Sequence, residues 1–180
     1  EIEAQTSVPM TLMEVCGSHT MAIARSGIRS LLPEKLSLLS GPGCPVCVTG
    51  AEEIDKILEL AMEPGLTIAS YGDMLRVPAG DKSLLQLKSS GSDIRIVLSP
   101  MDALQLAVEN PEREVVFFAV GFETTAPLTA ATINLANQKQ ITNFSILCAH
   151  KTMPAAIKAL LPGSEVYALI CPGHVAVITG

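Results

Sequence analysis

The strongest constraint on the fold is a regular alternation of short apolar runs with longer helical patterns. The apolar runs predict strands at residues 11–15, 36–40, 66–70, 94–99, 115–120, 144–149 and 166–170. The segments between them predict helices at about 20–32, 51–62, 82–90, 102–109, 127–139 and 154–161. Strands separated by helices of this length indicate repeated βαβ units, which form parallel sheets. The sequence therefore predicts an α/β fold of Rossmann-like lobes, with mainly parallel sheets flanked by helices.

Local signals place some boundaries. Thr49 and Glu52 fit a capping box at the start of the second helix. Thr125-Ala-Pro127 and Thr152-Met-Pro154 repeat a helix start that suits proline. The charged, proline-containing stretch 109–114 is the best candidate for a linker. We therefore expect a first lobe at residues 1–110 and a second at residues 111–180.

Composition excludes several classes of protein. The chain has 180 residues, of which 48% are hydrophobic and 17% charged, so it can bury a core and is not expected to be disordered. Its net charge of -6, without a run of Lys or Arg, argues against nucleic-acid binding. No apolar stretch reaches the roughly 20 residues that cross a bilayer, and the N-terminus lacks a signal-peptide layout. We expect a cytoplasmic protein, whose 5 cysteines stay reduced unless they are catalytic or bind metal.

The residues that can carry chemistry all follow predicted strands. They are Cys16, His19, Cys44, Cys47, Tyr71, Asp73, Glu123, Thr124, Thr125, His150, Cys171 and His174. In open parallel sheets, ligands bind at the carboxyl ends of the strands. The sequence therefore predicts one functional rim, in a cleft at these strand ends. Phosphate-binding glycine motifs and a Gly-x-Ser-x-Gly elbow are absent, so nucleotide binding and serine hydrolase chemistry have no motif support.

Cys44-Pro-Val-Cys47 is the clearest single motif. Its spacing suits a disulfide between near neighbours, and the helix that follows favours a thiolate. In a cytosolic α/β chain this spacing indicates first a redox pair and second half of a zinc site. Cys16 and His19 would complete a Cys3His zinc site. The surrounding Gly and Pro residues favour an exposed loop over two inert packing thiols.

The remaining candidates each allow two interpretations. Cys16 with His19 is either a metal ligand or activated thiol, or a buried cysteine beside a helix cap. Glu123, beside Thr124 and Thr125, is either a carboxylate that orients a partner or part of a helix N-cap.

Four residues near the C-terminal strands are also open. His150, and Cys171 with His174, are either ligands or satisfied turn residues. Cys148 lies inside an apolar run, so we expect it to face the core and to stay outside the chemistry.

Five motifs occur together in a fixed order: MEVCGSHT, GPGCPVCVT, YGDMLRVPAG, VVFFAVGFETTAP and CPGHVAVITG. In this combination the chain strongly resembles the HypD family of hydrogenase maturation proteins, essentially from Met13 to Gly180. The resemblance implies a cytoplasmic scaffold on which the Fe(CN)2CO unit of [NiFe]-hydrogenases is assembled. It also implies a complex with a HypC-like chaperone, followed by work with HypE-like and HypF-like proteins. Such a protein is a scaffold for metallocofactor assembly rather than a conventional enzyme.

The resemblance also implies residue roles. Cys16 would hold iron, with His19 in support. Cys44 and Cys47 would be a redox-active pair that closes to a disulfide. The segment 123–125 would line the same site, and His150 and His174 are candidates for it too.

Two departures from the family pattern stand out. Ser18 replaces the threonine usual in the first motif, but the hydroxyl is kept. The family continues into a region whose cysteines bind a [4Fe-4S] cluster, whereas this chain stops at Gly180. We therefore expect the two α/β lobes without their own cluster. Two alternatives remain: a thiol-disulfide oxidoreductase using only the CPVC motif, and a zinc-stabilised interaction module.

Overall fold

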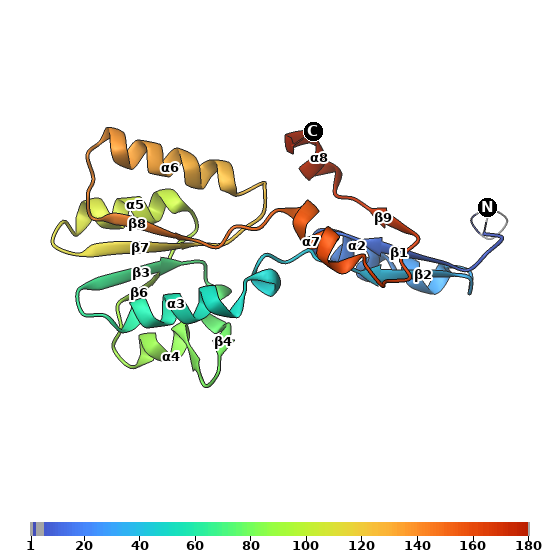
Figure 1. The fold of residues 1–180 in the computed structure, drawn as a ribbon, viewed down its shortest axis with the longest axis horizontal. Coiled ribbons are helices and arrows are strands. Elements are labelled where there is room, and N and C mark those ends of the chain that lie inside the picture. Colours follow the sequence, from blue (N-terminus) through green and yellow to red (C-terminus); the bar gives the residue numbers. More distant parts are fainter. Residues whose placement is uncertain (1, 3–5, 180) are drawn as a thin grey trace. The chain divides into compact units, whose positions relative to one another are not determined.

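The computed structural model describes residue 2 and residues 6–179, which form two compact units (Figure 1). Unit 1 combines the described residues of the N-terminal segment up to Val48 with those from Thr152 onward. Unit 2 is the continuous segment Thr49–Lys151. Along the chain, unit 2 is therefore an insertion between the two segments of unit 1.

Unit 1 contains a parallel sheet of three strands in the order β2-β1-β9. The strands are β1 (Met10–Glu14), β2 (Leu36–Ser40) and β9 (Ala168–Ile170). Its helices are α2 (Gly17–Ser26), η1 (Ile28–Leu31), η2 (Val46–Val48), α7 (Met153–Leu160) and α8 (Gly173–Thr179). The central strand β1 therefore pairs with one strand from each end of the chain.

Unit 2 contains a parallel sheet of four strands in the order β6-β3-β7-β8. The strands are β3 (Leu66–Ser70), β6 (Ile94–Ile96), β7 (Glu114–Ala119) and β8 (Phe144–Cys148). The helices are α3 (Ala51–Met62), η3 (Met74–Arg76), α4 (Leu84–Ser89), α5 (Pro100–Glu109) and α6 (Ala126–Gln138). A short antiparallel ladder, β4 (Pro78–Ala79) with β5 (Lys82–Ser83), precedes α4.

The core of unit 2 lies on both faces of its sheet. From Val115 to Ala119, every residue of β7 is buried, because the strand is central and covered on both sides. Val115, Phe117 and Ala119 pack with Ala103 and Ala107 of α5, as alternation along a strand requires. Helix α5 contacts α6, and α3 contacts α4; Figure 1 shows these two pairs on opposite sides of the strands.

Unit 1 has a much thinner core. Val15 is fully buried, but α2 contributes no buried residue. An apolar cavity of about 380 Å³ remains, bounded by residues of β1, α2, β2 and β9. Its apolar lining includes Leu12, Ile23 and Leu38. The sheet of unit 1 is therefore less tightly covered by its helices than the sheet of unit 2.

The α/β class with mainly parallel sheets is confirmed, and each of the seven predicted strands is present. The division of the chain differs from the expected break near residue 110. Asn110 follows α5 inside unit 2, and its neighbour β7 pairs with β3 in the same sheet. A charged, proline-containing loop between a helix and a strand has the composition of a linker, which explains the difference.

Two local expectations are wrong. Helix α3 begins at Ala51 with Gly50 as its N-cap, so Thr49 lies one residue before the N-cap position that the expected capping box assigned to it. The carboxylate of Glu53, not of Glu52, folds back over Gly50, where an added Cβ would lie 2.2 Å from Glu53 Oε2. Cys148 is exposed rather than buried, because it ends β8, an edge strand with a partner on one side only.

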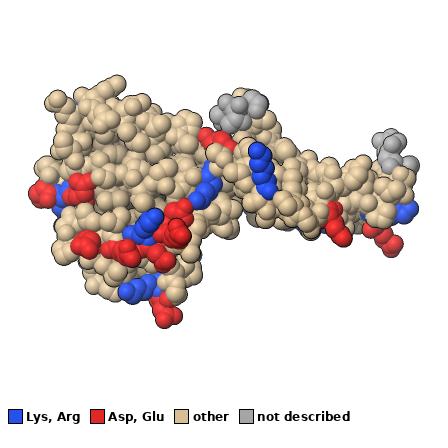
Figure 2. Space-filling view, in the orientation of Figure 1, with Lys and Arg blue, Asp and Glu red and all other residues tan. Residues whose placement is uncertain are grey.

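Both Thr-x-Pro helix starts are confirmed. Thr125 is the N-cap of α6 and Thr152 is the N-cap of α7, each with a proline in the first turn. Among the described residues, no helix has the length and apolar character needed to cross a membrane. On the face drawn in Figure 2, Lys and Arg side chains are scattered among Asp and Glu.

Candidate functional site

The parallel sheets sort the predicted site residues into two groups. In unit 1, Cys16 follows β1, the loop with Cys44 and Cys47 follows β2, and Cys171 follows β9. In unit 2, Tyr71 and Asp73 follow β3, residues 123–125 follow β7, and His150 follows β8. Because all strands within a sheet are parallel, each group gathers at the carboxyl edge of its own sheet.

In unit 1, the turn after β1 and the loop after β2 touch through their backbones. Gly17 N–H donates to the carbonyl of Gly43 over 3.3 Å. A Cβ on Gly43 would lie 2.3 Å from Gly17 N and 2.6 Å from the carbonyl carbon of Cys16. Only glycine allows such an approach. Because Gly43 has no side chain, the segment before Cys44 can lie directly against Cys16.

Cys16 occupies the N-cap position of α2, with φ 179° and ψ 130°. It is half-buried. The amide groups at a helix N-terminus stabilise negative charge nearby. The local fold therefore places this thiol at the N-terminal end of α2, where these amide groups lie.

His19 lies in the first turn of α2 and lines the apolar cavity of unit 1. Its Nδ1 atom is buried without a hydrogen-bond partner among the described residues. A polar atom in such surroundings loses its bonds to water. His19 is thus one polar group in a mainly apolar lining.

Cys44 and Cys47 form a tight pair. Cys47 N–H donates to the carbonyl of Cys44 over 3.1 Å, which closes one turn just before and into η2. Hydrogen bonding with Cys44 raises the pKa of the Cys47 thiol, and slight burial and the charge of Cys44 act in the same direction. No disulfide is formed in the described part of the chain. The two thiols are therefore hydrogen-bonded neighbours.

A buried carboxylate that sequence reasoning missed lies beneath this site. Glu14, the last residue of β1, is 0% exposed. Thr20 Oγ1 lies 2.9 and 2.8 Å from its two carboxylate oxygens, and Ser40 Oγ donates to Oε1 over 2.7 Å. Arg29 Nη2 lies 3.7 Å from Oε1 and also donates to Ser40 Oγ over 3.0 Å. The one signal in the sequence was a charged residue inside a predicted strand.

The other two predicted residues of unit 1 follow β9. Cys171 is exposed, and its backbone precedes α8. His174 lies within α8, but its side chain is outside the description.

In unit 2, Gly121 allows Thr125 and His150 to approach one another. A Cβ on Gly121 would lie 1.7 Å from Thr125 Oγ1 and 3.4 Å from His150 Nε2. Thr125 Oγ1 donates to the carbonyl of Phe122 over 3.0 Å. Glu123 is half-buried and Thr124 exposed in the same turn.

His150 is held as a neutral imidazole. Burial lowers its pKa, and the nearby backbone of Ala119 and Thr125 only partly opposes this. Its Nδ1 lies 3.7 Å from Cys148 Sγ. The next residue, Lys151, donates to Glu53 Oε1 over 2.5 Å, and this hydrogen bond is the main reason that the pKa of Glu53 is lowered.

Tyr71 and Asp73 serve the local fold. The Tyr71 ring packs edge-on against Phe117 with centroids 5.6 Å apart, and burial raises the pKa of its hydroxyl. Asp73 Oδ1 accepts the Met74 N–H over 3.0 Å at the start of η3.

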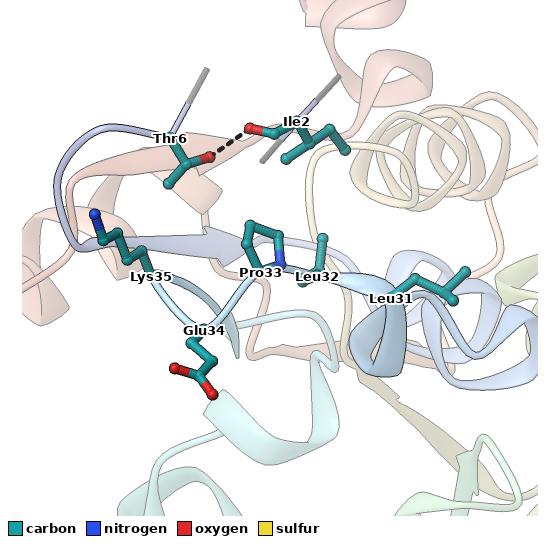
Figure 3. A pocket seen from close by; sticks show the side chains of 7 residues that line it. All are labelled: Ile2, Thr6, Leu31, Leu32, Pro33, Glu34 and Lys35. Atoms are coloured by element: carbon teal, nitrogen blue, oxygen red, sulfur yellow. Dashed lines mark hydrogen bonds between the residues drawn. The ribbon is translucent and has the colours of Figure 1, made fainter. Parts of the chain in front are cut away.

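No preformed metal cluster marks the site among the described residues, and one large hollow of unit 1 lies apart from it. The described residues contain no group of three His, Cys, Asp or Glu side chains arranged to hold a metal ion. A hollow of about 720 Å³ lies elsewhere in unit 1, and none of the residues that Figure 3 labels there is a predicted site residue. Those residues are Ile2, Thr6, Leu31, Leu32, Pro33, Glu34 and Lys35.

Comparisons with known proteins agree on one family. The model of the family described as "HypD: Hydrogenase formation hypA family" matches residues 1–180. The hydrogenase maturation factor HypD of Escherichia coli K12 is 48% identical over 174 residues, which are 96% of this chain and 47% of that protein. HypD of Rhodobacter capsulatus is 45% identical over 182 residues, and HypD of Azotobacter vinelandii is 47% identical over 186 residues. These matches cover 100% and 99% of this chain, and 48% and 49% of the two relatives.

The chain thus spans about half the length of the curated relatives that it matches. The family model covers it from end to end, and the relatives match nearly all of it at 45% identity or more. The chain belongs to the HypD family.

Proposed function

We propose that this chain acts in hydrogenase maturation as part of a scaffold that holds iron through Cys16. Iron is here the cargo on which the Fe(CN)2CO unit of a [NiFe]-hydrogenase is assembled. Membership of a family whose curated relatives are named hydrogenase maturation factors supports the process. The observation that carries the residue assignment is the contact of Gly43 with Cys16 and Gly17, which joins the two cysteine-bearing loops.

Cys16 suits iron because a thiolate is a strong donor to a soft or borderline metal. One thiolate does not fill the coordination sphere of iron, so the remaining ligands must come from elsewhere. A second protein such as a HypC-like chaperone, together with the incoming cyanide and CO, would supply them. This division agrees with the finding that no cluster of three ligands is preformed in the described residues.

Cys44 and Cys47 are proposed as the redox pair beside the iron. Closing their disulfide would oxidise the pair by two electrons, which the iron-bound unit under assembly accepts, and would release two protons to solvent. The hydrogen bond that raises the pKa of Cys47 comes from Cys44, so the two sulfurs lie close enough to interact. Such a pair fits the cytoplasm, where thiols are kept reduced and a disulfide is transient.

His19 and the unit 2 group of Glu123, Thr124, Thr125 and His150 are proposed as supporting residues, as is His174. HypE-like and HypF-like proteins are the expected further partners. The [4Fe-4S] cluster expected for longer members of the family is not assigned to any residue of this chain.

The test is anaerobic titration with ferrous iron in the presence of a HypC-like chaperone. The wild-type chain and Cys171→Ala should retain iron through gel filtration, whereas Cys16→Ala should lose it and keep its circular dichroism. Cys171 is a matched control because it also follows a strand of the same sheet. Equal iron in all three proteins would remove Cys16 from the role.

A thiol-disulfide oxidoreductase is the second candidate, favoured by the hydrogen-bonded Cys44/Cys47 pair. It predicts insulin reduction that survives Cys16→Ala and is lost in Cys44→Ala. Stoichiometric zinc that cannot be removed without unfolding would instead support the interaction module.

A further inference from the structure

Glu14 is the one fully buried acidic residue among those that the structure describes. A carboxylate taken out of water is costly unless hydrogen bonds and opposite charge compensate it. Glu14 has both kinds of compensation, and the partners come from three separate segments. Thr20 belongs to α2, Ser40 ends β2 and Arg29 belongs to η1.

These partners hold the segments that carry the thiols. Thr20 lies one helical turn after Cys16, and its N–H donates to the Cys16 carbonyl over 3.1 Å. Ser40 directly precedes Gly41, whose N–H donates to the Glu14 carbonyl over 2.8 Å. A Cβ on Gly41 would lie 2.9 Å from that same carbonyl oxygen. Through these hydrogen bonds, the side chain and the backbone of Glu14 therefore bind both the start of α2 and the start of the loop that carries Cys44.

We propose that Glu14 is a positioning residue for the thiol site, by which we mean Cys16, Cys44 and Cys47. Its carboxylate clamps the first turn of α2 to the end of β2, and so holds Cys16 at the helix N-terminus and against the Cys44 loop. This inference rests on the proposed function for its purpose, but the clamp itself is tested independently of iron.

The clamp has a consequence for the two segments that meet at Cys16. Thr20 N–H donates to the Cys16 carbonyl, and Gly17 N–H donates to the Gly43 carbonyl, so these two amides report whether the first turn of α2 stays in place. Releasing Thr20 from Glu14 should loosen this turn and let both amides exchange faster with solvent.

The test compares Thr20→Val with Thr20→Ser. Valine keeps the shape of threonine and removes the hydroxyl, while serine keeps the hydroxyl and removes the methyl group. Hydrogen exchange at the Gly17 amide, which donates to the Gly43 carbonyl, is followed by NMR, with the amides of unit 2 as the internal reference. Thr20→Val should accelerate exchange at Gly17 about tenfold or more, because it removes a hydrogen bond to a carboxylate. Thr20→Ser should restore the wild-type rate.

A role confined to the general stability of unit 1 would accelerate exchange at Gly17 and at the Val15 amide of the sheet equally in Thr20→Val, and that result would overturn the proposal. Should Thr20→Val fail to fold, Ser40→Ala supplies the second test. It removes the β2 donor and should accelerate hydrogen exchange at the Gly41 amide while the amides of unit 2 stay protected. Unchanged exchange at Gly41 would overturn the clamp.

The two proposals can fail separately. If Cys16→Ala retains iron but Thr20→Val accelerates exchange at the Gly17 amide, the clamp stands and the iron role fails. If Cys16→Ala loses iron but Thr20→Val and Thr20→Ser behave alike, the iron role stands and the clamp fails.

Discussion

Replacing Gly43 by alanine should disrupt the thiol site from its backbone outward. The added Cβ would lie 2.3 Å from Gly17 N and 2.6 Å from the carbonyl carbon of Cys16, where no flexible side chain can move aside. The two backbone segments must separate by several tenths of an ångström or more, which weakens the hydrogen bond from Gly17 N–H to the Gly43 carbonyl. Overpacking costs about 1–3 kcal/mol and a lost hydrogen bond about 0.5–1.5 kcal/mol. We expect unit 1 to lose about 2–4 kcal/mol of stability from these two effects.

The assay is native-state hydrogen exchange, which measures local opening free energies in each unit separately. The amide of Val15, which donates to the Ile170 carbonyl over 3.1 Å, reports on the sheet of unit 1. Gly72→Ala is the matched control, because its Cβ would meet only Ile96 Cγ2 at 3.5 Å, an ordinary contact. If Gly43→Ala lowers protection at Val15 no more than Gly72→Ala does, the backbone contact is not what joins the two loops.

Three further predictions concern titrating groups. Cys44→Ala should remove the hydrogen bond that raises the pKa of Cys47, so Cys47 should be alkylated faster at pH 8 than in the wild type; an unchanged rate would mean that the two thiols do not interact. The hydrogen bond from Lys151 lowers the pKa of Glu53, so this pair stabilises the folded protein at pH values above the ordinary pKa of a glutamate. The difference in stability between wild type and Lys151→Met should therefore vanish as the pH falls through the pKa of Glu53 in the folded protein. A difference that persists in acid would refute the pairing. Burial lowers the pKa of His150, so the midpoint of its NMR titration should lie below 6.5. The free energy of unfolding should decrease below pH 6.5, because His150 binds a proton more readily in the unfolded chain than in the folded one. A midpoint above 6.5 would contradict its burial.

Much of the fold could be predicted because the signals are local. The run at residues 115–120, which supplies all of β7 except Glu114, is apolar throughout, as is typical of a central parallel strand, and proline marks the starts of α6 and α7. The insertion of unit 2 could not be predicted in this way. It depends on β9 pairing with β1, where Leu12 lies opposite Ala168, and no local pattern specifies a partner so far along the chain.

Sequence reasoning could name the candidates whose chemistry shows in the residue type, as for Cys16 and the Cys44/Cys47 pair, and the structure brings their two loops into contact. Glu14 was missed because a glutamate is expected at the surface. Its burial follows from hydroxyl donors on Thr20 and Ser40, which come from two other segments of the chain. Cys148 was misjudged for the opposite reason, because an apolar strand at the edge of a sheet leaves some of its side chains exposed.

The central claim is that Cys16 holds iron while its diatomic ligands are installed. The most direct measurement is infrared spectroscopy of the anaerobically purified complex with a HypC-like chaperone, after incubation with the cyanide-supplying proteins. The wild-type chain should show the stretching bands of iron-bound CN and CO. Cys16→Ala, folded and still bound to the chaperone, should show neither band, and the same bands at the same intensity in that variant would contradict the account.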